Sequence, residues 1–103
     1  NISILVKRIF SEYDILIFIC ACGIAVRTIS PFIKSKISDP AVIVMDEQFK
    51  YVIPILSGHL GGANRISQII SNETGAKAVI TTATDTGGKF SVDSFAKANS
   101  LYI

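Results

Sequence analysis

The chain has 103 residues, half of them hydrophobic, which suits a single domain with a buried core. Ten Lys and Arg against eight Asp and Glu leave a net charge of +2, and the cations are scattered. This balance argues against a nucleic-acid partner. The longest strongly apolar run, residues 15–26, is too short for a membrane-spanning helix, which needs about 20 residues.

The first part of the chain alternates between helix and strand patterns. Apolar side chains recur at helical spacing over residues 2–13. The continuous apolar run at 15–20 predicts a strand buried on both faces, as in a parallel sheet. A second helix is expected over residues 23–33, where Pro31 either kinks it or begins a new turn that Ser30 caps.

The middle of the chain predicts two strands joined by a short connection. Residues 41–45 form a second buried strand after a turn, and residues 46–50 link it to an arm at 51–53, as in a hairpin. Pro54 places that arm toward a sheet edge, because proline lacks the amide that a central strand donates.

The next segment, residues 57–64, is called the glycine turn. It holds three of the seven glycines and the only histidine, His59, between a strand and a helix. Glycines let backbone amides approach a bound group closely, and the following helix N-terminus favours negative charge. Histidine has the one unperturbed pKa near neutrality. An anionic ligand and proton transfer are therefore expected to meet there.

The remaining residues complete an α/β pattern. A helix runs from the glycine turn to about residue 73, with Gly75 as its C-terminal cap, and residues 78–80 form a short strand. A polar loop at 81–89 and a last short helix, with a strand at 101–103, follow. The alternation predicts one three-layer α/β/α domain over residues 1–103, with a mainly parallel sheet.

Ligands of open α/β sheets bind beyond the carboxyl ends of strands, so the polar residues that follow the predicted strands are the candidates. They are Arg27, Asp46, Ser57, Gly58, His59, Gly61, Gly62, Asn64, Thr81, Thr82 and Asp85. Each also has a purely structural interpretation. Asp46 can solvate a hairpin turn, Asp85 can form an Asx turn, Ser57 can cap a helix, and Arg27 can lie on a solvated face.

Several other site types are disfavoured. The glycine turn lacks the Lys-Ser or Lys-Thr of a P-loop, and its glycine spacing differs from the dinucleotide fingerprint. With one histidine and no second ligand pair beside Cys20 and Cys22, no protein-bound metal is expected. The two cysteines are too close along a strand to bridge without strain, so we expect reduced thiols, which favour the cytoplasm.

Four segments, residues 23–27, 39–47, 56–64 and 79–85, resemble the cobalamin biosynthesis protein G family in order and spacing. The specific part is Ser-Gly-His-Leu-Gly-Gly-Ala-Asn at 57–64 combined with Ile-Thr-Thr-Ala-Thr-Asp at 80–85. The similarity runs over residues 13–103 and covers only the N-terminal region of that family. A first strand before Asn1 and a C-terminal domain are expected in members, and Phe49 stands where members tend to have glycine.

The resemblance implies a cobalt-precorrin-5A hydrolase of the anaerobic vitamin B12 route, which opens a lactone, releases acetaldehyde and yields cobalt-precorrin-5B. It implies His59 as the base, with Asp46 or Asp85 orienting it or replacing it. The amides of Gly61 and Gly62 would stabilise the oxyanion. Substrate carboxylates would meet Arg27 and the polar residues of the two motifs, Ser57, Gly58, Asn64, Thr81 and Thr82. Cobalt would arrive in the tetrapyrrole substrate, so no resident cofactor is expected.

Two alternatives stay open. The chain is a non-catalytic tetrapyrrole-binding module that works with the enzyme's own C-terminal domain, or it is an α/β domain that binds a phosphate or nucleotide at the glycine turn. Neither nucleic acid nor a membrane is an expected partner, and a homodimer is left open.

Overall fold

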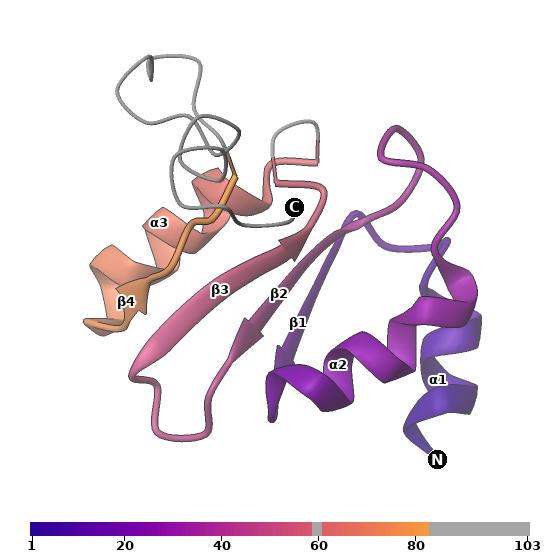
Figure 1. Cartoon of the computed structure of the whole chain (residues 1–103), viewed down its shortest axis with the longest axis horizontal. Coiled ribbons are helices and arrows are strands. Elements are labelled where there is room, and N and C mark those ends of the chain that lie inside the picture. Colours follow the sequence, from indigo (N-terminus) through magenta and orange to yellow (C-terminus); the bar gives the residue numbers. More distant parts are fainter. Residues whose placement is uncertain (59–60, 83–103) are drawn as a thin grey trace, which may run out of the picture.

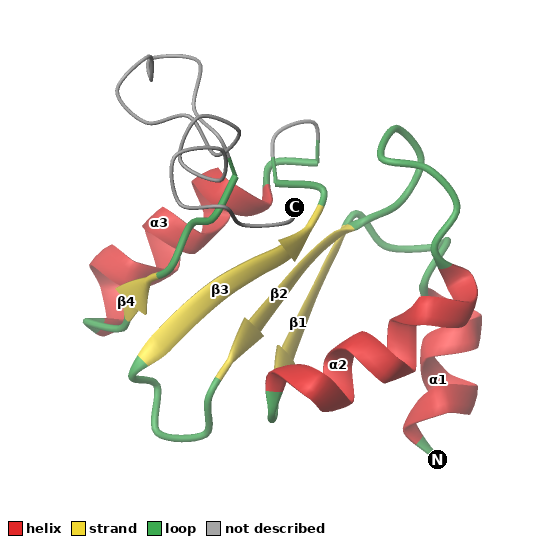
Figure 2. Cartoon of the chain, in the orientation of Figure 1, coloured by secondary structure: helices red, strands yellow, loops and turns green. Residues whose placement is uncertain are grey.

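The computed structural model describes residues 1–58 and 61–82, which form a sheet with helices on both faces (Figures 1 and 2). The elements are α1 (Ile2–Ile9), β1 (Ile15–Ile19), α2 (Cys22–Ile29), the 3-10 turn η1 (Ser30–Phe32), β2 (Ala41–Met45), β3 (Tyr51–Leu56), α3 (Ala63–Thr74) and β4 (Lys77–Ala78). None of the helices among these residues has the length and apolar character needed to cross a membrane. The helix and strand predicted near the end of the chain lie outside the described residues.

Helix ends follow from local chemistry. Pro31 ends α2 by turning the chain into η1, as proline lacks the amide that continues a helix. Ser30 does not cap the new turn, because its hydroxyl donates to the Val26 carbonyl at 2.6 Å. Gly75 ends α3 with φ of 81°, and its amide donates to the Ser71 carbonyl at 2.9 Å. The predicted C-terminal cap is therefore confirmed.

Among the described residues the strand order is β1-β2-β3-β4. The β1–β2 and β3–β4 pairs are parallel and the β2–β3 pair is antiparallel, which confirms a mainly parallel sheet and the hairpin. The edge position predicted for β3 is wrong at its start, because Tyr51 and Val52 pair with β4. Pro54 is tolerated because its ring nitrogen faces the side of β4, and the two residues of β4 pair only with Tyr51 and Val52. Among the described strands, no hydrogen bond therefore needs an amide at residue 54.

These strand directions give the sheet two different edges. The ends of β1 and β2 and the start of β3 share the hairpin edge, where residues 46–50 connect β2 to β3. The starts of β1 and β2 and the end of β3 share the opposite, glycine-turn edge. Figure 1 shows the hairpin at the lower end of the sheet and the β3–α3 connection at the upper end.

The core has two parts that lie on opposite faces of the sheet. Helices α1 and α2 pack on the face that carries Phe18 and Val44, and α3 packs on the face that carries Ile43 and Val52. All five residues of β2 are buried because both faces of this strand are covered. The three-layer α/β/α architecture is thus confirmed, with β2 at its centre.

Strand β1 is buried on only one face, contrary to the sequence prediction. Leu16 and Phe18 lie under α1 and α2, whereas Ile15, Ile17 and Ile19 are 39%, 48% and 52% exposed. Helix α3 packs over β3, β4 and β2, and its packing does not extend to β1. Among the described residues β1 pairs only with β2, so it presents an open apolar edge.

Candidate active site at the glycine turn

The glycine-turn edge gathers most of the predicted site residues. The glycine turn follows β3, and the segment after β4 runs to the same edge because β4 is parallel to β3. A direct contact joins them, since the Asn64 side-chain amide donates to the Thr82 hydroxyl at 2.7 Å. The predicted residues brought to this edge are Ser57, Gly58, Gly61, Gly62, Asn64, Thr81 and Thr82. His59 and Asp85 lie outside the described residues.

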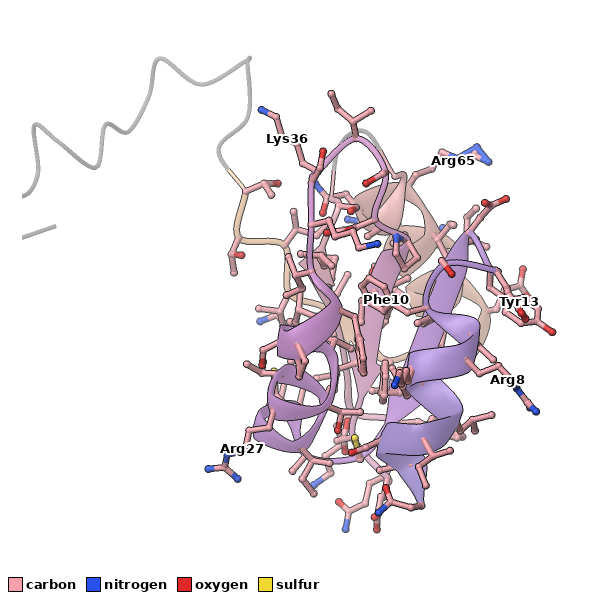
Figure 3. All side chains as sticks on the ribbon, turned by 90° about the vertical axis from the view of Figure 1, so that its right-hand side faces the viewer. Arg8, Phe10, Tyr13, Arg27, Lys36 and Arg65 are labelled. Carbon is pink, nitrogen blue, oxygen red and sulfur yellow. The ribbon has the colours of Figure 1, made fainter. Side chains whose placement is uncertain are left out.

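Asp46 and Arg27 are not part of this group. Asp46 follows β2 at the hairpin edge, so the expectation that all these polar residues share one edge is wrong. The reason is the antiparallel β2–β3 pair. Because the two strands run in opposite directions, β3 ends at one edge of the sheet and β2 ends at the other. Helix α2 begins at the hairpin edge, and Arg27 points to solvent in the lower part of Figure 3, far from Arg65.

The Asp46 carboxylate organises the hairpin connection. It accepts the backbone amides of Tyr51 at 2.7 Å, Lys50 at 2.8 Å and Gln48 at 3.2 Å. These bonds hold the pKa of Asp46 below its usual value of 3.8, and the bond from the Tyr51 amide has the largest effect. A carboxylate with a lowered pKa is a weaker base, so this geometry favours the structural interpretation of Asp46.

Backbone hydrogen bonds close the glycine turn onto the start of α3. The amide of Ala63 donates to the Ser57 carbonyl at 3.2 Å, and that of Asn64 donates to the Gly58 carbonyl at 3.0 Å. Ser57 has φ of 58° and Gly62 has φ of 82°, the left-handed conformation that glycine adopts without strain. The turn is therefore a closed loop, held at both ends.

Gly61 is the most tightly packed residue of this loop. An ideal Cβ there would lie 2.5 Å from the Ser57 Cβ, 2.9 Å from the Ser57 carbonyl oxygen and 3.4 Å from the Ala41 nitrogen. Any side chain at this position would push Gly61 and Ser57, the two sides of the glycine turn, apart. Close packing of the backbone thus explains this glycine.

A second loop is joined to the glycine turn. The Ser57 hydroxyl donates to the Asp39 carbonyl at 3.3 Å. The buried Asp39 carboxylate in turn accepts the amides of Lys34 at 2.9 Å and Ser35 at 3.1 Å. Asp39 therefore shapes the loop that precedes β2. The sequence indicated only that a turn lies at this position.

A mainly polar hollow of about 380 Å³ opens between the end of α1, the loop before β2 and the glycine turn. Gly61 forms one of its walls. The other lining residues are Phe10, Ser11, Tyr13, Asp14, Ile37, Ser38, Asp39 and Pro40. These other lining residues were not among the predicted site residues, because they lie before strands rather than after them.

Two cations near this edge were also missed as candidates. Arg65 and Lys36 lie in the upper part of Figure 3, and both are exposed. Arg65 is the third residue of α3, so its place directly after the glycine turn was a usable signal. Cations here add to the positive end of the α3 dipole and favour an anionic group.

The glycine turn can also supply donors to a developing negative charge. Within residues 1–58 and 61–82, the amides of Gly61 and Gly62 donate to no acceptor. Within the same residues there is no group of three or more His, Cys, Asp and Glu side chains that could hold a metal. Cys20 and Cys22 are free thiols on the hairpin side of the sheet. The described site can thus bind an anionic or carbonyl-bearing ligand through backbone donors.

Comparison with known proteins assigns this site to a family. Residues 4–85 match the family model described as cobalamin synthesis G N-terminal, a span that includes the glycine turn, Thr82 and Asp85. The chain belongs to the cobalamin synthesis G N-terminal family. The resemblance drawn from the two sequence motifs is therefore confirmed.

Individual members of the cobalamin synthesis G family are similar over most of this chain. A cobalt-precorrin-5A hydrolase of Salmonella typhimurium is 48% identical over 90 residues, covering 87% of this chain and 26% of that protein. One of Priestia megaterium is 41% identical over 97 residues, covering 94% and 26%. A crystal structure of a cobalamin biosynthesis protein G homolog from Sulfolobus solfataricus aligns with a TM-score of 0.69 at 34% identity, covering 88% of this chain and 27% of that one. This chain thus spans about a quarter of these relatives.

Proposed function

We propose that this chain is the N-terminal part of a cobalt-precorrin-5A hydrolase of cobalamin biosynthesis. The complete enzyme would open the lactone of cobalt-precorrin-5A, release acetaldehyde and yield cobalt-precorrin-5B. The observation that carries the proposal is the family match over residues 4–85, which includes the glycine turn and Thr82, the threonine joined to it. The names of the two relatives that are 48% and 41% identical support the same reaction.

Lactone hydrolysis makes three demands on the site. A base takes a proton from water as the water oxygen bonds to the lactone carbonyl carbon. Donors stabilise the oxyanion that forms on the carbonyl oxygen, until the bond to the ring oxygen breaks and leaves a carboxylate and a hydroxyl. Acetaldehyde then leaves when the hydroxyl loses its proton and the C–C bond to the macrocycle breaks, with the electron pair of that bond and a proton passing to the macrocycle. Cationic groups hold the carboxylate side chains of the tetrapyrrole. Cobalt belongs to the substrate in this scheme.

Residues of the two sequence motifs and of the start of α3 are assigned to these roles. His59 is the proposed base, and Asp85 is the proposed residue that orients it. Gly61 and Gly62 are the proposed oxyanion donors, which is supported by amides without an acceptor in the described part of the chain. Arg65 replaces Arg27 as the cation proposed to meet substrate carboxylates, because it follows the glycine turn directly. Asp46 is left out because of its place at the hairpin edge.

We also propose a partner for this domain within the longer protein. The rest of the longer protein would work with this domain on the tetrapyrrole, since the chain spans about a quarter of its relatives. The cytoplasmic location and the homodimer stay predictions.

Acetaldehyde release from cobalt-precorrin-5A tests the proposal. The full-length protein and the isolated chain are each mixed with the substrate, and acetaldehyde is quantified. We expect release from the full-length protein. Release from the isolated chain as well would place all catalytic residues here, and tetrapyrrole binding without turnover would make this domain a binding module. No release from the full-length protein, with a related hydrolase as positive control, would refute the proposed reaction.

A further inference from the structure

Asn64 connects two segments of the candidate site that lie far apart in the sequence. Its side-chain amide donates to the Thr82 hydroxyl at 2.7 Å, and its backbone amide donates to the Gly58 carbonyl at 3.0 Å. One residue at the start of α3 therefore holds both the glycine turn and the segment after β4.

Gly58 is the third member of this contact. An ideal Cβ at residue 58 would lie 2.8 Å from the Asn64 Oδ1 and 3.1 Å from the Thr82 Cγ2. The Asn64 amide and the Thr82 methyl group thus occupy the space that any side chain at this position would need. Gly58 permits the contact by having no side chain.

The amide oxygen of Asn64 is not placed to meet a ligand in this arrangement. This Oδ1 is buried from solvent and has no hydrogen-bond partner among the described residues, while the Nδ2 group donates one N–H to Thr82. The side chain is thus engaged with protein atoms through both ends of its amide group.

We propose that Asn64, Thr82 and Gly58 form a clamp, and that Asn64 is a positioning residue for the hydrolysis instead of a substrate contact. The clamp fixes the backbone at Gly58 and ties it to the segment after β4 at Thr82. It thereby sets the distance between the glycine turn and that segment. This inference rests on the proposed function, because positioning is defined by the reaction it serves.

The clamp has a clear kinetic signature. Loss of alignment at the reacting centre lowers kcat. Loss of a contact that binds substrate and transition state equally well raises KM and leaves kcat unchanged. In the full-length enzyme we expect Thr82→Val, which keeps the shape of the side chain but removes the acceptor, to lower kcat about 10- to 100-fold with KM within about threefold. Asn64→Ala, which removes the side-chain donor, is expected to do the same. Asn72→Ala, the same chemical change on the exposed part of α3, serves as the control.

A double-mutant cycle and a structural measurement complete the test. If the two residues act as one clamp, combining Asn64→Ala with Thr82→Val lowers kcat no further than the stronger single change. Hydrogen exchange of the Ala63 and Asn64 amides, which close the glycine turn, is expected to speed up in Thr82→Val at unchanged global stability.

The outcomes separate the clamp from the proposed function. An active parent enzyme whose Thr82→Val and Asn64→Ala variants keep their kcat, or change only KM, would overturn the clamp and leave the reaction intact. A parent that releases no acetaldehyde would refute the reaction, and the exchange of the two amides would then decide the clamp alone. Unchanged exchange in Thr82→Val would overturn it.

Discussion

Replacement of Gly61 by alanine tests how tightly Gly61 and Ser57 pack against each other within the glycine turn. The new methyl group would overlap the Ser57 carbonyl oxygen, a backbone atom 2.9 Å away that also accepts the Ala63 amide. Because this atom cannot rotate aside like a flexible side chain, we expect a cost in the upper part of the range for overpacking, about 2–3 kcal/mol of unfolding free energy. For a domain of this size the Tm would fall by roughly 10 °C or more.

Gly23→Ala is the matched control for this change. A Cβ at Gly23 meets no atom within 4 Å, and the residue lies inside α2. Alanine there is expected to raise the unfolding free energy by about 0.5–1 kcal/mol, because glycine is costly inside a helix. Urea denaturation followed by circular dichroism measures both variants. A Gly61→Ala variant that unfolds at the parent's urea concentration, beside a stabilised Gly23→Ala variant, would contradict the packing described for the turn.

Three further predictions concern the rest of the fold. Asp46→Asn should lower the unfolding free energy at neutral pH. The difference in unfolding free energy from the parent should shrink as the pH falls below 3.8 and through the lowered pKa of Asp46, because the parent then loses its charged acceptor. Thermal unfolding against pH measures this, and a difference that grows in acid would be inconsistent with it. Phe49 has φ of 57°, so Phe49→Gly should stabilise the hairpin by about 0.5–1 kcal/mol in urea denaturation, with a loss of stability as the contrary result. Ile17→Lys, at the exposed face of β1, should reduce self-association of the isolated chain in sedimentation experiments without unfolding it. Unchanged self-association would mean that the chains do not associate through β1.

The layered architecture could be predicted from the sequence because burial patterns are local. Residues 41–45 are continuously apolar, and β2 is buried on both faces as that pattern suggests. The same pattern failed for β1, where Ile17 and its neighbours on one face are exposed. An apolar run shows that a strand can be covered on both faces, but whether a helix covers the second face depends on the placement of α3, a tertiary property.

The meeting of two segments at the candidate site could be predicted from the sequence, but not the place of every residue. The glycine turn and Thr82 meet as expected, because both follow strands that run in the same direction. Asp46 was placed with them although the predicted hairpin already required the next strand to run the opposite way. Gly58 and Gly61 were interpreted as openings for a ligand, whereas the structure shows protein atoms of Asn64, Thr82 and Ser57 close to where their side chains would lie.

The most direct test of the account compares the two edges of the sheet in one assay. Acetaldehyde release from cobalt-precorrin-5A is measured for the full-length protein and for its His59→Asn and Asp46→Asn variants, each checked for folding. The account predicts release by the parent, a fall of about 100-fold or more in His59→Asn, as expected for a lost general base, and a rate near the parent's in Asp46→Asn. A large loss in Asp46→Asn with little change in His59→Asn would place the chemistry at the hairpin edge and contradict the account.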